Sequence, residues 1–244
     1  MNVVTSWRQG DYAAGQFALV MHNRAARFDQ TRPGILCFHG RNATGASFMQ
    51  HVLFGLTPHI TALLNEGYIV YSIDAGGLTT WGNDVAMDAA LAALDRMEEM
   101  TKPGMSALMG WSMGGLNALN FMKRHPSRLR GAFLWAPAAD LGWAHSQPAW
   151  TTEINNAYGG NYAVNSVGHD PASEPAAYRD LPPIHVVSSE DDDVLSTSET
   201  EDFVAAVNDP NLTMETLSSG AHFPFNEYDQ EDSLGRFKEW FEWA

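Results

Sequence analysis

Cysteine is almost absent from this chain. Its 244 residues include a single one, Cys37, so no disulfide can form within the chain and an apolar core has to hold the fold together. Cys37 lies in the apolar run Ile35-Leu36-Cys37-Phe38. We therefore expect a small buried strand residue there rather than a reactive thiol.

Positive charge is also scarce. The chain has 14 Lys and Arg against 29 Asp and Glu, a formal net charge of −15. Such an excess of negative charge repels phosphate backbones and anionic membrane surfaces. We therefore expect a soluble protein without a nucleic-acid partner.

Long hydrophobic runs and metal-ligand motifs are missing too. No apolar run approaches the roughly 20 residues that span a bilayer, and no basic region followed by an apolar stretch begins the chain. We expect neither a signal peptide nor membrane insertion, and hence a cytoplasmic location. The histidines lack H-E-x-x-H spacing, and the four acids of 190–193 lack EF-hand spacing, so we expect no metal and no cofactor.

Apolar residues, by contrast, are plentiful at 45% of the chain. Short apolar runs alternate with helical patterns, which is typical of an α/β domain with a mostly parallel sheet and helices on both faces. Helices are expected at 83–100, capped by Asn83 or Asp84, and at 227–243. Parallel strands are expected at 35–39, 68–73, 106–110, 131–136, 184–188 and 212–217, after an antiparallel pair at 3–7 and 17–21.

One stretch, residues 141–183, contains no clean strand. A long excursion after a strand of a sheet enzyme usually covers the site, so we divide the chain into a core (1–140 and 184–244) and a cap (141–183). Aromatic side chains there suit an acyl chain, an aromatic group or a sugar ring, although they could also form a small local core. The candidate substrate-binding residues are Trp111, next to the serine described below, and Trp143, His145, Trp150 and Tyr158.

The most informative segment is Gly110-Trp111-Ser112-Met113-Gly114. It joins an apolar strand to a helix with Leu116, Leu119 and Met122 on one face, which is the context of a G-x-S-x-G nucleophile elbow. Small residues on both sides let the backbone turn tightly around the serine. Ser112 is therefore the candidate nucleophile, since the other interpretation, a small residue in a turn, does not explain the partners found downstream.

A serine hydroxyl needs a base, and the base needs an acid to orient it. His222 directly follows a predicted strand and is the candidate base. The candidate acid lies in the acidic loop after the strand 184–188, where Asp192 is preferred and Asp191 and Asp193 remain alternatives. The N–H of Met113, at a helix start, and the N–H of Arg41, after Gly40, would form the oxyanion hole. His39 is expected to brace that loop, and Asp74 to be a turn residue.

These motifs resemble the α/β-hydrolase family from residue 35 to the C-terminus. His39-Gly40, Gly110-Trp111-Ser112-Met113-Gly114 and Gly220-Ala221-His222 carry the resemblance, whereas Ser189 and Ser196 stand where that family usually has glycine and proline around the acid. The resemblance implies a sheet of about eight strands and a serine hydrolase with a Ser112–Asp192–His222 triad. Residues 81–84 and 153–160 resemble hydrolases of actinobacterial phages, which implies a virion-associated alternative location.

The expected reaction is hydrolysis of a carboxylic ester, by way of an acyl-enzyme, on a small-molecule or cell-envelope substrate. No residue selects an ester over an amide, or water over an alcohol as acceptor, so an amidase or an acyltransferase would use the same triad. A non-catalytic binding or virion module is the alternative from another class. The sequence does not indicate an oligomeric state.

Overall fold

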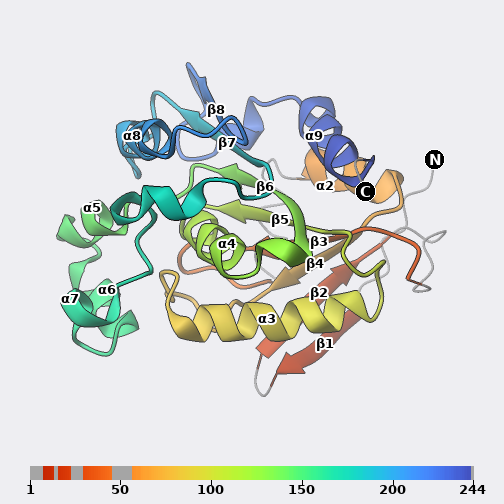
Figure 1. Cartoon of the computed structure of the whole chain (residues 1–244), viewed down its shortest axis with the longest axis horizontal. Coiled ribbons are helices and arrows are strands. Elements are labelled where there is room, and N and C mark those ends of the chain that lie inside the picture. The colour runs from red at the N-terminus through yellow and green to blue at the C-terminus, as the bar shows by residue number, and fades with distance from the viewer. Residues whose placement is uncertain (1–7, 14–15, 23–29, 46–56, 243–244) are drawn as a thin grey trace.

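The computed structural model describes residues 8–13, 16–22, 30–45 and 57–242, and contains an eight-stranded sheet (Figure 1). Its order is β1-β2-β4-β3-β5-β6-β7-β8. β1 and β2 are antiparallel to their neighbours, and the remaining strands are parallel to one another. The strands are β1 (Arg8–Ala13), β2 (Gln16–Met21), β3 (Gly34–Phe38), β4 (Ile69–Ile73), β5 (Ser106–Trp111), β6 (Leu129–Trp135), β7 (Ile184–Ser189) and β8 (Leu212–Leu217).

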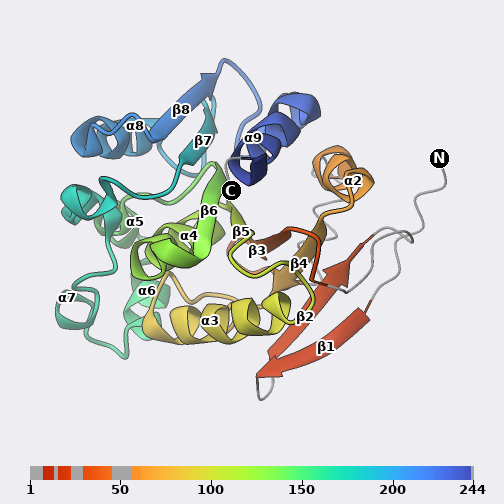
Figure 2. The same ribbon diagram turned by 45° about the vertical axis from the view of Figure 1, so that its right-hand side comes forward.

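Helices cover both faces of the sheet (Figures 1 and 2). Apolar residues of α3, α4 and α8 pack in one core cluster with the sheet, and those of α2 and α9 pack in another on the opposite face. The α-helices are α2 (Thr57–Asn65), α3 (Asp84–Glu98), α4 (Met113–Arg124), α5 (Leu141–Ser146), α6 (Thr151–Ala157), α7 (Tyr162–Asn165), α8 (Thr197–Val207) and α9 (Gln230–Glu242), with 3₁₀ turns at Pro126–Arg128, Pro171–Ser173, Pro175–Tyr178 and Pro224–Asn226. Among the described residues, no helix is both long and apolar enough to cross a membrane.

The predicted fold class is confirmed, because the central parallel strands are buried on both faces. Every residue of β3, β4, β5 and β7 is buried, and a strand covered by helices on both sides needs such a continuous apolar run. Asn83 caps α3, because its side chain accepts a hydrogen bond from the N–H of Ala86. Cys37 is fully buried in β3, and burial raises the pKa of its thiol.

The antiparallel pair at the start of the chain differs from its prediction. The second strand was expected at 17–21 and is β2, but the first strand lies at Arg8–Ala13. The expected strand at 3–7 falls outside the described residues. The structure also ends the last helix at Glu242 and begins it at Gln230, after a separate 3₁₀ turn, rather than at residue 227.

The excursion between β6 and β7 contains the short helices α5, α6 and α7, which gather at one end of the sheet (Figure 1). Buried residues of this segment form a small core of their own with Met113 and Leu116 of α4 and with Trp81. Leu141, Ala144, Ile154 and Tyr158 are its members from the excursion. This packing holds α5 and α6 next to the residues that follow β5.

Candidate active site

Ser112 occupies the sharp turn between β5 and α4. Its backbone has φ 58° and ψ −123°, a conformation that costs an L-residue energy and is typical of functional turns. The turn is held in place by the Ser112 N–H, which donates to the carbonyl of Trp135 at 2.9 Å. The serine side chain therefore sits at the carboxyl end of the sheet, where ligands usually bind in α/β folds.

The elbow depends on glycines because neighbouring backbone lies almost in contact with it. A Cβ atom at Gly114 would lie 2.2 Å from the carbonyl oxygen of Phe38 and 2.5 Å from that of His39, and one at Gly110 would lie 2.5 Å from the carbonyl oxygen of Gly114. Backbone cannot move aside as a flexible side chain can. The small residues predicted on either side of the serine are therefore required by the close approach of α4 to β5 and to the end of β3.

We expect Gly114→Ala to destabilise the protein by about 3 kcal/mol, at the upper end of the usual cost of overpacking. The measurement is the free energy of unfolding from urea titration. Gly235→Ala is the matched control, since Gly235 lies within α9 and nothing lies within 4 Å of its added Cβ. That control should stabilise the protein by about 0.5–1 kcal/mol through helix propensity; equal effects of the two substitutions would contradict the steric argument.

His222 bridges Ser112 and Asp192. Its Nε2 lies 2.9 Å from the Ser112 hydroxyl and its Nδ1 lies 2.8 Å from Oδ2 of Asp192. All three side chains are shielded from water, with 8% of the His222 side chain and 1% of the Asp192 side chain exposed. The structure therefore brings together the three predicted residues in the order hydroxyl, imidazole, carboxylate.

Asp192 is held by backbone amides as well as by the imidazole. Its Oδ1 accepts hydrogen bonds from the N–H groups of Val194 (2.8 Å) and Leu195 (2.9 Å). Burial acts to raise the pKa of the carboxyl, but the hydrogen bond and charge of His222 and the two amides act the other way, and the pKa lies below its usual value. Asp192 is therefore ionised at neutral pH and fixed in orientation.

The other acidic residues of the loop have different places. Oδ1 of Asp191 accepts the N–H of Ala221 at 2.7 Å, and Ala221 has a φ of 48°, so Asp191 supports the turn just before His222. Asp193 is exposed and lines a groove beside the acidic loop. Of the three candidate acids, only Asp192 reaches the imidazole.

The loop after β3 lies directly against the elbow. The carbonyls of Phe38 and His39 approach Gly114, and the His39 ring, which is fully buried, lies between the carbonyl oxygens of Gly40 (2.7 Å) and Asp74 (2.9 Å). This geometry fits the bracing role predicted for His39. Asp74 also holds the loop, since its Oδ1 accepts the N–H of Gly45 at 2.7 Å.

The two predicted oxyanion donors are one backbone amide of this loop and one at the start of α4. Within the described residues, the N–H groups of Asn42 and Ala43 donate to the carbonyls of Leu78 and Gly40, whereas those of Arg41 and Met113 have no backbone acceptor. Met113 is the first residue of α4, where the N–H groups precede the first intrahelical hydrogen bond. Both predicted oxyanion donors are therefore available to a ligand.

A groove of about 580 Å³ runs along the acidic loop and the excursion. Asp192 is the one triad residue in its lining, and the indoles of Trp143 and Trp150 form part of its wall, 5.9 Å apart and edge to face. These two of the predicted substrate-binding residues are thus placed to contact a ligand next to the site.

The other three predicted substrate-binding residues do not line this groove. Trp111 is buried beneath the loop of His222, donates to the His222 carbonyl at 2.9 Å, and packs against the imidazole. Tyr158 is buried and its hydroxyl donates to the carbonyl of Trp81 at 2.7 Å. His145 stacks on Tyr162 at 3.8 Å. Aromatic composition alone could not separate groove residues from residues of the local core.

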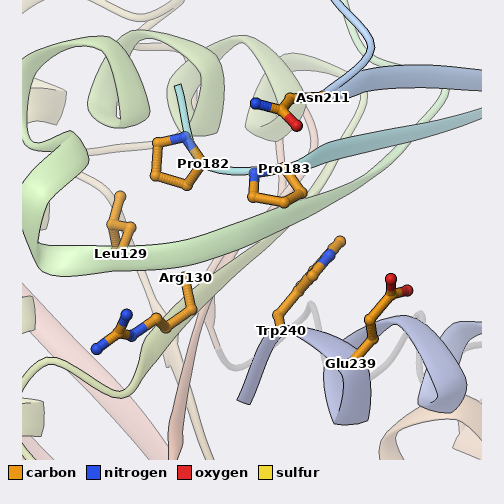
Figure 3. Close-up of a pocket in the computed structure, with 7 residues that line it drawn as sticks. All are labelled: Leu129, Arg130, Pro182, Pro183, Asn211, Glu239 and Trp240. Carbon is orange, nitrogen blue, oxygen red and sulfur yellow. The ribbon is translucent and has the colours of Figure 1, made fainter. Parts of the chain in front are cut away.

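A second pocket, of about 360 Å³, lies at the opposite end of the strands (Figure 3). Its lining includes Leu129, the first residue of β6, and Pro183 and Asn211, which directly precede β7 and β8. Ser112 follows the last residue of β5, so this pocket is far from the triad. Within the described part of the chain, no group of three or more His, Cys, Asp or Glu side chains could hold a metal ion.

Comparison with known proteins places this site in a family. The model of the prolyl oligopeptidase family matches residues 56–244. The chain belongs to this family. None of the curated proteins matches it in sequence.

Solved structures share the α/β-hydrolase fold with this member of the family. Oligopeptidase B from Leishmania major has a TM-score of 0.73 at 15% identity over 99% of this chain, which spans only 37% of that protein. An esterase from Rhizomucor miehei has a TM-score of 0.72 at 13% identity, covering 100% of this chain and 84% of the other. A fluorophosphonate-binding serine hydrolase from Staphylococcus aureus has a TM-score of 0.76 at 13% identity, covering 96% and 98%.

The chain therefore has the family and the fold of a serine hydrolase. Two supporting residues of its site have no signal in the sequence. Asp191 looks like one more acid of a solvated loop, and Glu153 stands in an excursion without regular periodicity. Glu153 nevertheless binds the side chain of Arg41, a residue to which the sequence assigned a role only through its backbone N–H.

Proposed function

We propose that this hydrolase cleaves a carboxylic ester through an acyl-enzyme intermediate. The observation that carries the proposal is the continuous chain from Ser112 Oγ through His222 to Asp192, with distances of 2.9 and 2.8 Å. An imidazole that donates from Nδ1 to a carboxylate has Nε2 free to accept a proton, which is the arrangement a general base needs.

In the first half of the reaction, Nε2 of His222 takes the hydroxyl proton of Ser112 while Oγ forms a bond to the ester carbonyl carbon. The carbonyl oxygen becomes an oxyanion between the N–H groups of Met113 and Arg41. When the intermediate collapses, the bond to the leaving oxygen breaks and that oxygen takes the proton from His222. Water then attacks the acyl group by the same route and releases the acid, which regenerates Ser112.

An ester requires less of this site than a peptide does. An alcohol leaves more readily than an amine, and a peptide substrate must also be bound along its backbone. The lining of the groove includes the indoles of Trp143 and Trp150 and the carboxylates of Glu190 and Asp193. Apolar walls suit an acyl or aromatic group, and the two carboxylates disfavour an anionic one.

A peptidase is the second candidate because the family match is to prolyl oligopeptidases. The esterase from Rhizomucor miehei, which this chain covers over most of its length, supports the ester. A small-molecule or cell-envelope ester remains our proposed substrate, with water as the acceptor rather than an alcohol. The cap role of residues 141–183 belongs to the same proposal, since Trp143 of α5 and residues 147–150, between α5 and α6, line the groove.

The test compares substrates that share one acyl group. We expect p-nitrophenyl esters of N-acyl amino acids to be hydrolysed while the matching p-nitroanilides release no measurable nitroaniline, and p-nitrophenyl esters of increasing chain length to define the depth of the groove. Absorbance of the released nitrophenol or nitroaniline measures both. Turnover of the anilides would favour the peptidase instead.

A further inference from the structure

Glu153 of α6 connects the excursion to the loop that carries Arg41. Its Oε1 lies 2.7 Å from Arg41 Nε and its Oε2 lies 2.9 Å from Arg41 Nη2. This is the two-pronged pairing of a guanidinium with a carboxylate, the geometry that best fixes both groups. The two residues are 112 positions apart in sequence, and 35% of the Arg41 side chain and 21% of the Glu153 side chain are exposed.

A third donor fixes Glu153 from the other side. The indole Nε1 of Trp81 donates to Oε1 at 2.7 Å. Trp81 itself cannot shift easily, because it is 2% exposed, has a φ of 48° and offers its carbonyl to the Tyr158 hydroxyl. Two residues further along the loop, the side-chain amide of Asn83 donates to the carbonyl of Ala157 at 2.7 Å. Both ends of α6 are therefore attached to the loop between β4 and α3.

The backbone on either side of Arg41 has hydrogen bonds of its own, including that of the Gly40 carbonyl with the His39 ring. The N–H of Asn42 donates to Leu78, that of Ala43 to Gly40, and that of Gly45 to Asp74. At Arg41 the N–H has no backbone acceptor within the described residues, so the side chain supplies the contact that sets the orientation of this peptide. A guanidinium held at two points restricts where the Arg41 N–H can point.

We propose that Glu153 is a positioning residue for the oxyanion hole, because it holds Arg41 so that its N–H faces the carbonyl oxygen at Ser112. This inference rests on the proposed acyl transfer. It also gives the excursion a second role beside lining the groove, because α6 connects the excursion to the Arg41 N–H, one of the two amides that stabilise the transition state.

A tether that only attaches the excursion would have a different kinetic signature. Loss of such a tether would weaken substrate binding and raise KM. Loss of a positioning contact displaces a donor that acts most strongly in the transition state, which lowers kcat and leaves KM nearly unchanged. A misplacement of about 1 Å can cost on the order of 100-fold in rate.

The experiment compares Glu153→Gln with Glu174→Gln. Glu174 lies in the same excursion and pairs with Lys123 at 3.1 Å, so the control removes a charge and an ion pair without touching Arg41. For Glu153→Gln we expect kcat on p-nitrophenyl esters to fall roughly 10- to 100-fold with KM within about twofold. Affinity for an alkyl boronic acid, which forms a tetrahedral adduct on Ser112, should fall by the same factor as kcat/KM.

A double substitution adds a second readout. Arg41→Met removes the guanidinium but keeps the amide, and we expect the same loss in kcat, with no further loss when Glu153→Gln is added. Thermal unfolding midpoints of Glu153→Gln and Glu174→Gln should agree, which separates positioning from folding. Unchanged kcat in Glu153→Gln, or a raised KM with unchanged kcat, would overturn the inference. Wild-type protein that neither cleaves esters nor reacts with a fluorophosphonate would instead overturn the proposed function.

Discussion

Ser112→Ala is expected to reduce ester turnover by on the order of 10⁶-fold and to abolish labelling by a fluorophosphonate probe. The alanine lacks the Ser112 hydroxyl, whose oxygen lies 2.9 Å from His222 Nε2. The backbone of the elbow should persist, because the Ser112 N–H bond to Trp135 and the steric fit of Gly114 do not involve the hydroxyl. Turnover is measured with p-nitrophenyl esters, and labelling by the mass of the intact protein.

Ser198→Ala is the control for this experiment. Ser198 lines the groove and pairs with Ser196, so it is the kind of nearby serine that a reactive probe could modify without any triad. We expect this variant to be labelled and to turn over like the wild type. Equal labelling of Ser112→Ala and wild type would show that the probe reacts elsewhere and would favour a non-catalytic binding module.

Most of the parallel part of the fold could be predicted from the sequence because β3 to β7 are almost entirely buried, whereas β8 lies at the edge of the sheet and is partly exposed. The expected strand 212–217 matches β8, and the other five parallel strands begin and end within two residues of their predicted limits. Burial on both faces produces an apolar run that needs no knowledge of neighbours. β1, with the sequence Arg-Gln-Gly-Asp-Tyr-Ala, is an edge strand, and its pairing with β2 rather than its own pattern decides where it forms.

The triad order could also be predicted, since each residue lies in the segment that follows a strand and parallel strands end at one edge of the sheet. The choice of Asp192 among three adjacent aspartates depended on family spacing, and the structure adds the reason in the two amides that point its carboxylate at His222. Contacts such as Arg41 with Glu153 could not be predicted. They join segments far apart in sequence, and the short helices of the excursion have no periodicity that shows which side chains face inward.

Asp192→Asn is expected to lower kcat by about 10⁴-fold, because the asparagine selects the wrong tautomer of His222. The N–H groups of Val194 and Leu195 both donate to Oδ1, so the amide oxygen of an asparagine will take that place and its NH₂ will face Nδ1 of the imidazole. To accept this hydrogen bond, His222 must carry its proton on Nε2, where it can no longer accept the proton of Ser112. The defect is in kcat, measured on p-nitrophenyl esters at saturating concentration.

Two neighbouring substitutions control for charge and for loop structure. Asp193→Asn removes the same charge from an exposed position, and kcat should stay within about twofold of the wild type. In Asp191→Asn the amide oxygen can still accept the N–H of Ala221, so we expect a loss of no more than roughly tenfold, on the scale of a slightly misplaced catalytic group.

Because the pKa of Asp192 is lowered chiefly by its bond to His222 against the effect of burial, its carboxylate also stabilises the fold above the pKa of an unfolded aspartate. That contribution is lost as the pH falls through the lower pKa of the folded state. Asp192→Asn should therefore have a smaller free energy of unfolding than the wild type at pH 7, and this difference should shrink in acid. In the kinetic experiment, a larger defect in Asp193→Asn than in Asp192→Asn would place the triad acid one residue further along the chain.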